Sequence, residues 1–133
     1  MEFQRPYFTT FPTVGIFTTD GVYAAALNQD GTVNSAANPA PPETVVTLFG
    51  TGGAWSFGTL DNAVATAANP LFDDWGVTDS SGNELTVLYA GMAPGLLCGV
   101  FQVNVLLLPN EVPQTLRLTT AFGASNPVRV YVK

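Results

Sequence analysis

The side chains that could do chemistry are few in this sequence, and they are scattered along it. There is no histidine, and the single cysteine, Cys98, stands between Leu97 and Gly99. A chain without histidine cannot build Ser-His-Asp or Cys-His nucleophilic sites, nor bind a metal through imidazole. No basic residue neighbours Cys98 to favour a thiolate, so we expect a small buried thiol rather than a nucleophile.

Three aspartates form the only local acidic cluster of the sequence. Asp73, Asp74 and Asp79 lie in the segment FDDWGVTDSSGNE. Oxygen ligands at such spacing could hold calcium, but neither the EF-hand loop nor a calcium-binding nonapeptide repeat is present. The same carboxylates, with Glu84, could serve as the acid pair of a hydrolase. A solvated acidic loop is the favoured interpretation, and we assign no catalytic residue, no metal site and no cofactor.

Exposed aromatic side chains are the other candidates for a site. Trp55, Trp75 and Tyr89 could stack on a sugar ring, which makes them the candidate ligand-binding residues. Tryptophan also fills the open end of a β-sandwich, and this structural role is the favoured one for both tryptophans. The GTGG segment at 50–53 lacks the Lys and Ser/Thr of a phosphate-binding loop, so it predicts a tight turn after a strand.

Composition and charge exclude several classes of partner. The 133 residues include 47% hydrophobic and 11% charged residues, with a formal net charge of −6. Negative charge repels a phosphate backbone, so nucleic acid is excluded, and no apolar run is long enough for membrane insertion. One cysteine cannot form an internal disulfide. The low charge is typical of exported β-rich domains, and we expect an extracellular or cell-surface protein whose signal peptide lies upstream of this sequence.

The elements that must position these residues are predicted to be strands. Ten prolines and thirteen glycines interrupt the chain, and no helical apolar period persists. Eight short segments rich in Val, Thr, Phe and Tyr predict an all-β, immunoglobulin-like antiparallel β-sandwich. They are 7–11, 14–18, 22–28, 45–49, 85–90, 100–107, 114–120 and 128–132. Alternating apolar rows in the last three predict one antiparallel meander.

The chain divides into an arm and a sandwich in this interpretation. Residues 1–42 form an N-terminal arm that packs on or pairs with the sandwich of residues 43–133. Asp30-Gly31 predicts a tight hairpin turn within the arm, and SAANPAPPE predicts an extended connector after it. The segment LDNAVATAANP remains open between a short helix and an edge strand. Because exposed edges need cover, the arm or an edge strand could also pair two copies into a homodimer.

One uncharged stretch is interpreted as architecture. VLYAGMAPGLLCGVFQVNV holds two apolar runs around a small-residue loop. Gly91 and Gly95 permit unusual backbone angles, and Pro94 stops ladder pairing. We therefore predict that LYAGMAPG carries the chain from one sheet of the sandwich to the other.

Several stretches together resemble one family, in the order GIFTTDGVYAAALNQDGTVNSAANPA, TVVTLFGTGG, GTLDNAVATAANPL, VLYAGMAPGLLCGVFQVNV and FGASNPVRVYVK. The chain from Thr13 onward is similar to the Solibacter uncharacterised C-terminal domain family of exported acidobacterial proteins, although residues 72–84 depart from its pattern. VTLFGTG also resembles the opening strand of IPT/TIG domains. The resemblance implies an immunoglobulin-like sandwich and no catalytic residue. We expect a non-catalytic accessory or structural C-terminal module whose partners are neighbouring domains, or alternatively a carbohydrate- or protein-binding (adhesion) module.

Overall fold

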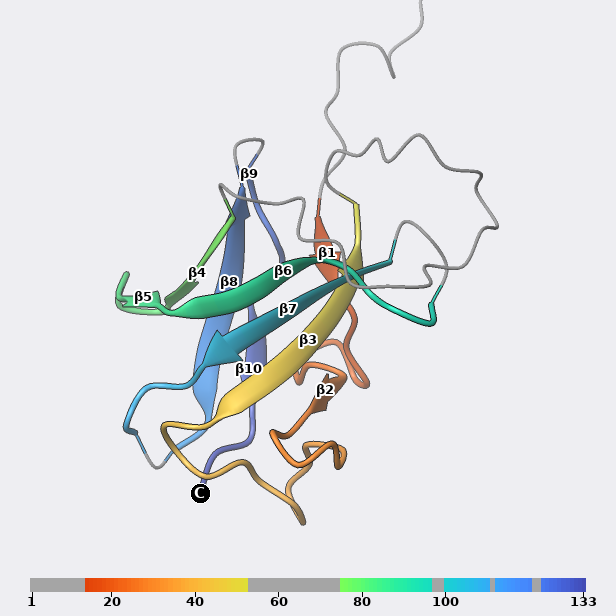
Figure 1. Cartoon of the computed structure of the whole chain (residues 1–133). Coiled ribbons are helices and arrows are strands. Elements are labelled where there is room, and N and C mark those ends of the chain that lie inside the picture. Colours follow the sequence, from red (N-terminus) through yellow and green to blue (C-terminus); the bar gives the residue numbers. More distant parts are fainter. Residues whose placement is uncertain (1–13, 53–74, 97–99, 111, 121–122) are drawn as a thin grey trace, which may run out of the picture.

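The computed structural model describes residues 14–52, 75–96, 100–110, 112–120 and 123–133, and every regular element in them is a strand. Two antiparallel sheets of five strands each pack face to face, which confirms the predicted all-β sandwich (Figure 1). The strands are β1 (Gly15–Ile16), β2 (Ala26–Leu27), β3 (Val45–Thr51), β4 (Gly76–Asp79), β5 (Glu84–Leu85), β6 (Val87–Met92), β7 (Val100–Leu106), β8 (Gln114–Thr120), β9 (Gly123–Ala124) and β10 (Val128–Val130). Predicted segments 7–11 and LDNAVATAANP lie outside the described residues.

Each sheet is built around one long central pair of strands. The first sheet has the order β1-β3-β7-β6, and β2 also pairs with β3. The second sheet has the order β10-β8-β4-β5, and β9 also pairs with β8. In the view of Figure 1 the strands β3, β7 and β6 lie in front of β8 and β10.

The core lies between the sheets and is formed by alternate residues, as the apolar rows predict. Along β3 and β7 every second side chain is buried, and β8 repeats the pattern. The buried apolar side chains of these three strands are Val46, Leu48, Phe101, Val103, Val105, Leu116 and Leu118. Alternation on a pleated strand thus places one apolar row inside and one mixed row outside.

The prediction of a meander over the last three long strands is wrong. β7 belongs to the first sheet, whereas β8 and β10 pair in the second, so the PNEVP connection crosses the sandwich. Gln114 holds this crossing: its buried side chain donates from Nε2 to the carbonyl of Leu108 at 2.9 Å and accepts from the amide of Leu108 at 3.1 Å. Strands of both sheets show the same alternation, so the pattern does not say which sheet a strand joins.

The predicted role of LYAGMAPG is also wrong. Its strand β6 pairs with β7 in the same sheet, with Ala90 opposite Val103 and Met92 opposite Phe101. The chain changes sheets earlier, at Thr86 between β5 and β6. A β-bulge follows this change, between Val87 and Tyr89. Bulges bend a strand and allow it to leave one partner for another, and they have no clear sequence signature here.

The hairpin turn predicted in the arm is present. The amide of Asn28 donates to the carbonyl of Thr32 at 2.7 Å, and the amide of Gly31 donates to the carbonyl of Asn28 at 2.9 Å. Gly31 has φ +86°, whereas Asp30 keeps an ordinary φ, so this is a three-residue loop closed by glycine. The extended connector predicted next is wrong in its first half, because Ser35 and Asn38 exchange backbone hydrogen bonds across a tight turn.

Two asparagine side chains tie the arm to the second sheet by imitating a strand partner. Asn34 is buried; its Nδ2 donates to the carbonyl of Tyr131 at 2.8 Å and its Oδ1 accepts from the amide of Tyr131 at 2.9 Å. Asn126 does the same for Ile16: its Oδ1 accepts from the amide of Ile16 at 2.9 Å, and its Nδ2 donates to the carbonyl of Ile16 at 3.3 Å. Parallel bridges join Tyr23 to Arg129 and Ala40 to Val132. The described arm residues therefore cover the free edge of β10, while the boundary at residue 42 stays a prediction.

Candidate binding surface

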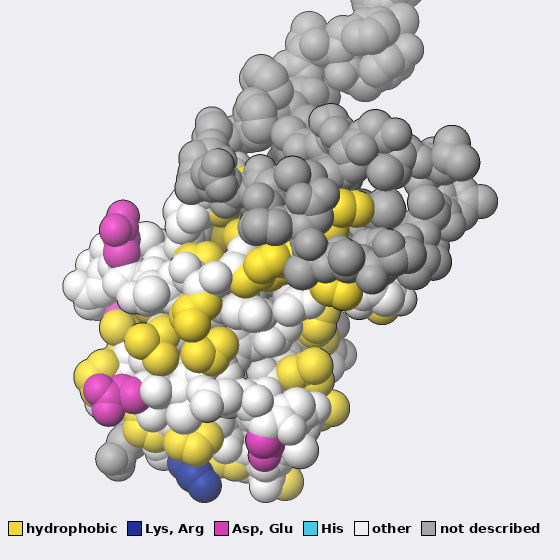
Figure 2. Space-filling view, viewed as in Figure 1, with side chains coloured by type: hydrophobic (Ala, Val, Ile, Leu, Met, Phe, Trp, Pro, Cys, Tyr) yellow, Lys and Arg dark blue, Asp and Glu magenta, His cyan; other side chains and the backbone are white. Residues whose placement is uncertain are grey.

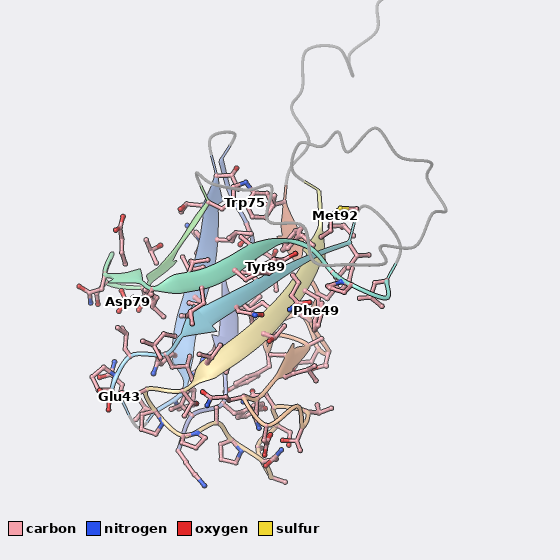
Figure 3. The ribbon with its side chains drawn as sticks, in the orientation of Figure 1. Glu43, Phe49, Trp75, Asp79, Tyr89 and Met92 are labelled. Atoms are coloured by element: carbon pink, nitrogen blue, oxygen red, sulfur yellow. The ribbon has the colours of Figure 1, made fainter. Side chains whose placement is uncertain are left out.

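The predicted aromatic candidates do not come together. Trp55 lies outside the described residues. Trp75 is half-buried just before β4, packs against the core and meets the Phe101 ring edge-on, with ring centroids 5.0 Å apart at 89°. Tyr89 lies on the outer face of the first sheet, and its hydroxyl donates to the carbonyl of Met92 at 2.6 Å (Figure 3). Trp75 and Tyr89 are thus on opposite faces of that sheet.

Of the acidic candidates, Asp79 is engaged in a turn. Asp73 and Asp74 lie outside the described residues. The Asp79 carboxylate accepts from the amides of Ser81 and Asn83 at 2.9 and 2.8 Å and from Asn83 Nδ2 at 3.0 Å. The Asn83 side chain is the main reason that the pKa of Asp79 is lowered. Within the described ranges no group of three or more metal-ligating side chains occurs, and Glu84 is exposed on β5.

Asp20 and Asp30 close turns in the same way. The amide of Tyr23 donates to Asp20 at 2.8 Å, and this hydrogen bond is the largest cause of the lowered pKa of Asp20. The hydroxyl of Thr32 donates to Asp30 and lowers the pKa of that carboxyl. These three carboxylates act on their own backbone, which is the usual role of aspartate in Asx turns.

The glycine-rich segment has a packing explanation. β3 extends through Thr51, beyond the predicted end of the strand. A Cβ on Gly50 would lie 2.1 Å from the carbonyl oxygen of Gly15 and 2.4 Å from the Phe101 ring. Glycine is therefore required where β1, β3 and the core meet, and a phosphate-binding role has no support. Gly53 and Cys98 lie outside the described residues.

The aromatic cluster that the sequence analysis missed lies on the outer face of the second sheet. The Tyr23 and Tyr131 rings are stacked, with centroids 3.8 Å apart at 4°, and the Arg129 guanidinium lies 5.4 Å from the Tyr23 centroid. The parallel bridge between Tyr23 and Arg129 sets this register, because it places the arm beside β10. We call these three residues the tyrosine stack. Partial burial raises the pKa of Tyr131, and the nearby Tyr23 and Asp20 add to the effect.

A shallow pocket adjoins the stack on the same sheet. It measures about 250 Å³ and is lined by Thr78, Asp79, Ser80, Thr115, Leu116, Arg117 and Pro127. Thr115 pairs with Arg129 across the β8–β10 ladder, so the pocket and the stack are contiguous. Arg117 is exposed two residues further along β8. The sequence contains one signal for this surface: three of its four basic residues, Arg117, Arg129 and Lys133, lie in the last seventeen positions of the given sequence.

Fold and surface together define a β-sandwich module with a local aromatic and cationic patch. No match to this chain is found among protein-family models, curated proteins or solved structures. No helix within the described residues is long and apolar enough to cross a membrane.

Proposed function

We propose that this chain is a non-catalytic, immunoglobulin-like accessory module of a secreted or cell-surface bacterial protein, acting as a spacer or stabiliser beside neighbouring domains. The observation that carries the proposal is that several of its aspartate and asparagine side chains serve the fold. Asp20, Asp30 and Asp79 close their own turns, and Asn34 and Asn126 join the arm to the second sheet. A domain whose polar side chains satisfy its own turns and its own sheet edge is suited to be one module of a longer chain.

Strand order supports the immunoglobulin-like part of the proposal. If β3, β7 and β6 are equated with strands B, E and D, and the arm strands with A, the first sheet has the order A-B-E-D. The second sheet, β10-β8-β4-β5, then corresponds to G-F-C with an added C′ strand. Trp75, directly before β4, stands where immunoglobulin-like domains carry a core tryptophan on strand C.

The low charge of the composition supports export. Only 11% of the residues are charged, and Thr, Ser, Asn and Gln supply much of the polar surface. An immunoblot of cell fractions from the source organism tests this part: signal in the culture medium or on the cell surface is expected, and signal confined to the cytoplasm would contradict it.

Independent folding is tested on the chain alone. Urea unfolding followed by tryptophan fluorescence and by far-ultraviolet circular dichroism should give one coincident cooperative transition. Transitions that differ between the two probes, or the absence of a transition, would show that the module depends on its neighbours. Turnover of ester, glycoside or peptide substrates by the purified chain, lost on substitution of a described side chain, would overturn the non-catalytic assignment.

A further inference from the structure

We propose that the outer face of the second sheet binds an acidic sugar, a pyranose that carries a carboxylate or sulfate, at the junction of the tyrosine stack with the pocket beside Arg117. This inference goes beyond the proposed module function and does not depend on it. It rests on three features of the described residues: two arginines placed next to each other, an aromatic stack beside them, and a pocket lined by hydroxyl groups.

The two arginines are close enough to bind one anion. Arg129 on β10 pairs with Thr115 on β8, and Arg117 is two residues further along β8. Diagonal neighbours on one face of an antiparallel pair have Cα atoms about 7–8 Å apart, within reach of long side chains. Both arginines are exposed on that face, because their neighbours Leu116, Val128 and Val130 point into the core.

Neither of the two arginines is held in an ion pair by a described carboxylate. Within the described part of the chain, Arg117 and Arg129 form no ion pair; the recorded contact of Arg129 is with the Tyr23 ring. The Asp79 carboxylate lines the same pocket and keeps its negative charge; its oxygens accept hydrogen bonds from Ser81 and Asn83 and form no ion pair with Arg117. Two like charges side by side in a chain of net charge −6 are explained if they bind an anion from outside, because guanidinium groups bind carboxylate or sulfate oxygens through paired hydrogen bonds.

The stack and the pocket indicate that the anion is attached to a sugar. Because the two rings cover each other and Arg129 lies over Tyr23, the C–H face of a pyranose would contact the remaining face of the partly exposed Tyr131 ring, and the tyrosine hydroxyl group offers a hydrogen bond at its edge. Thr78, Ser80 and Thr115 place hydroxyl groups along the pocket. A volume of about 250 Å³ is below that of the usual deep ligand pocket, and it suits one unit of a chain that continues across the sheet.

Binding is tested with four polymers and the intact chain. Polygalacturonate carries carboxylates, dextran sulfate carries sulfates, inorganic polyphosphate is an anion without sugar, and dextran is a sugar without charge. Affinity electrophoresis or calorimetry should detect binding to at least one of the first two and none to polyphosphate or dextran. The first two polymers distinguish carboxylate from sulfate. Equal retention by polyphosphate, retention by dextran, or no binding to either acidic polysaccharide would overturn the proposal.

Substitutions locate the site and separate it from general charge attraction. Arg117→Gln and Arg117→Lys should each weaken binding at least tenfold, since lysine keeps the charge but lacks the planar pair of donors. Tyr131→Ser should also weaken it. Lys133→Gln removes the same charge outside the arginine pair and should leave the affinity within twofold. Arg117 is exposed and forms no hydrogen bond or ion pair within the described part of the chain, so its variants should keep the wild-type unfolding midpoint. If Lys133→Gln weakens binding as much as Arg117→Gln, the proposal is wrong.

Discussion

The two sheets share one kind of inner face and differ on their outer faces. On the outer face of the first sheet, Thr47 donates to Asn104 Oδ1 at 3.0 Å and Gln102 donates to the same atom at 3.1 Å. Phe49 and Tyr89 stand on either side of these neutral groups in the strand register. Figure 2 shows white and yellow side chains in the middle of this face and charged ones at its margins.

The outer face of the second sheet holds instead both described arginines and the tyrosine stack. Its polar groups are less completely paired with each other, because Arg117 has no described side-chain partner. The inner faces therefore provide cohesion in both sheets, whereas the outer face of the first sheet has paired neutral groups at its middle and that of the second has two arginines without an ion pair to a described residue. This difference predicts that core substitutions have similar effects in the two sheets, and that substitutions on the two outer faces have different effects.

The largest effect is expected in the core, and it should be similar in the two sheets. Leu48 on β3 and Leu116 on β8 are both fully buried. Replacing either with alanine removes apolar contacts and leaves a cavity, so each variant should lose about 2–5 kcal/mol of the free energy of unfolding in urea. If Leu48→Ala keeps the wild-type free energy of unfolding while Leu116→Ala loses much of it, the second sheet alone holds the fold.

The next effect tests the junction between arm and second sheet. Asn34→Ala should lower the free energy of unfolding by about 2–3 kcal/mol, because the amide and carbonyl of Tyr131 lose their partners. Asn38→Ala is the matched control: its side chain is exposed, although it also donates two hydrogen bonds, to Thr32 and Val33. If both variants lose the same free energy, burial of Asn34 is not what makes the junction important.

A smaller effect is expected where the arm reverses direction. Gly31→Ala should cost about 1 kcal/mol, because φ +86° is strained for a residue with a Cβ. Gly15→Ala is the control, since a Cβ there would meet its nearest atom, Asn126 Oδ1, at an ordinary 3.8 Å. Chemical denaturation of both variants checks the difference, and an equal loss at Gly15 would assign the cost to general loss of glycine rather than to the turn.

The sequence predicts those parts of this fold whose signal is local along the chain. Alternation along a strand is local, so the buried rows of β7, β8 and β10 are predicted residue by residue. The Asp30-Gly31 turn is local too. Assignment of strands to sheets is not local: β7 and β8 have equivalent patterns but lie in different sheets, and what separates them is pairing with strands elsewhere in the chain, β3 and β6 for β7 and β4 and β10 for β8.

The candidate surface was missed for the same reason. Tyr23 and Tyr131 are 108 positions apart in the sequence numbering, and only the parallel bridge between Tyr23 and Arg129 brings their rings together. Residue type is the signal that makes the tryptophans and Tyr89 candidates. Trp75 proved to be packed against the core, which residue type alone does not reveal.

The smallest effect concerns pH, and it should not distinguish the sheets. Asp20 and Asp30 in the arm and Asp79 at the end of β4 all have lowered pKa values. A carboxyl whose pKa is lower in the folded state stabilises the fold above its unfolded value of 3.8, and this stabilisation is lost as the pH falls through the folded value. The contribution of these groups to the unfolding midpoint in urea should therefore be constant between pH 7 and 5 and decline below about pH 4. Asp30→Asn keeps an oxygen acceptor for the Thr32 amide and cannot titrate, so its decline should be shallower than that of the wild type. If neither this substitution nor Asp79→Asn changes the decline of the unfolding midpoint below about pH 4, the turns do not depend on the carboxylate charge.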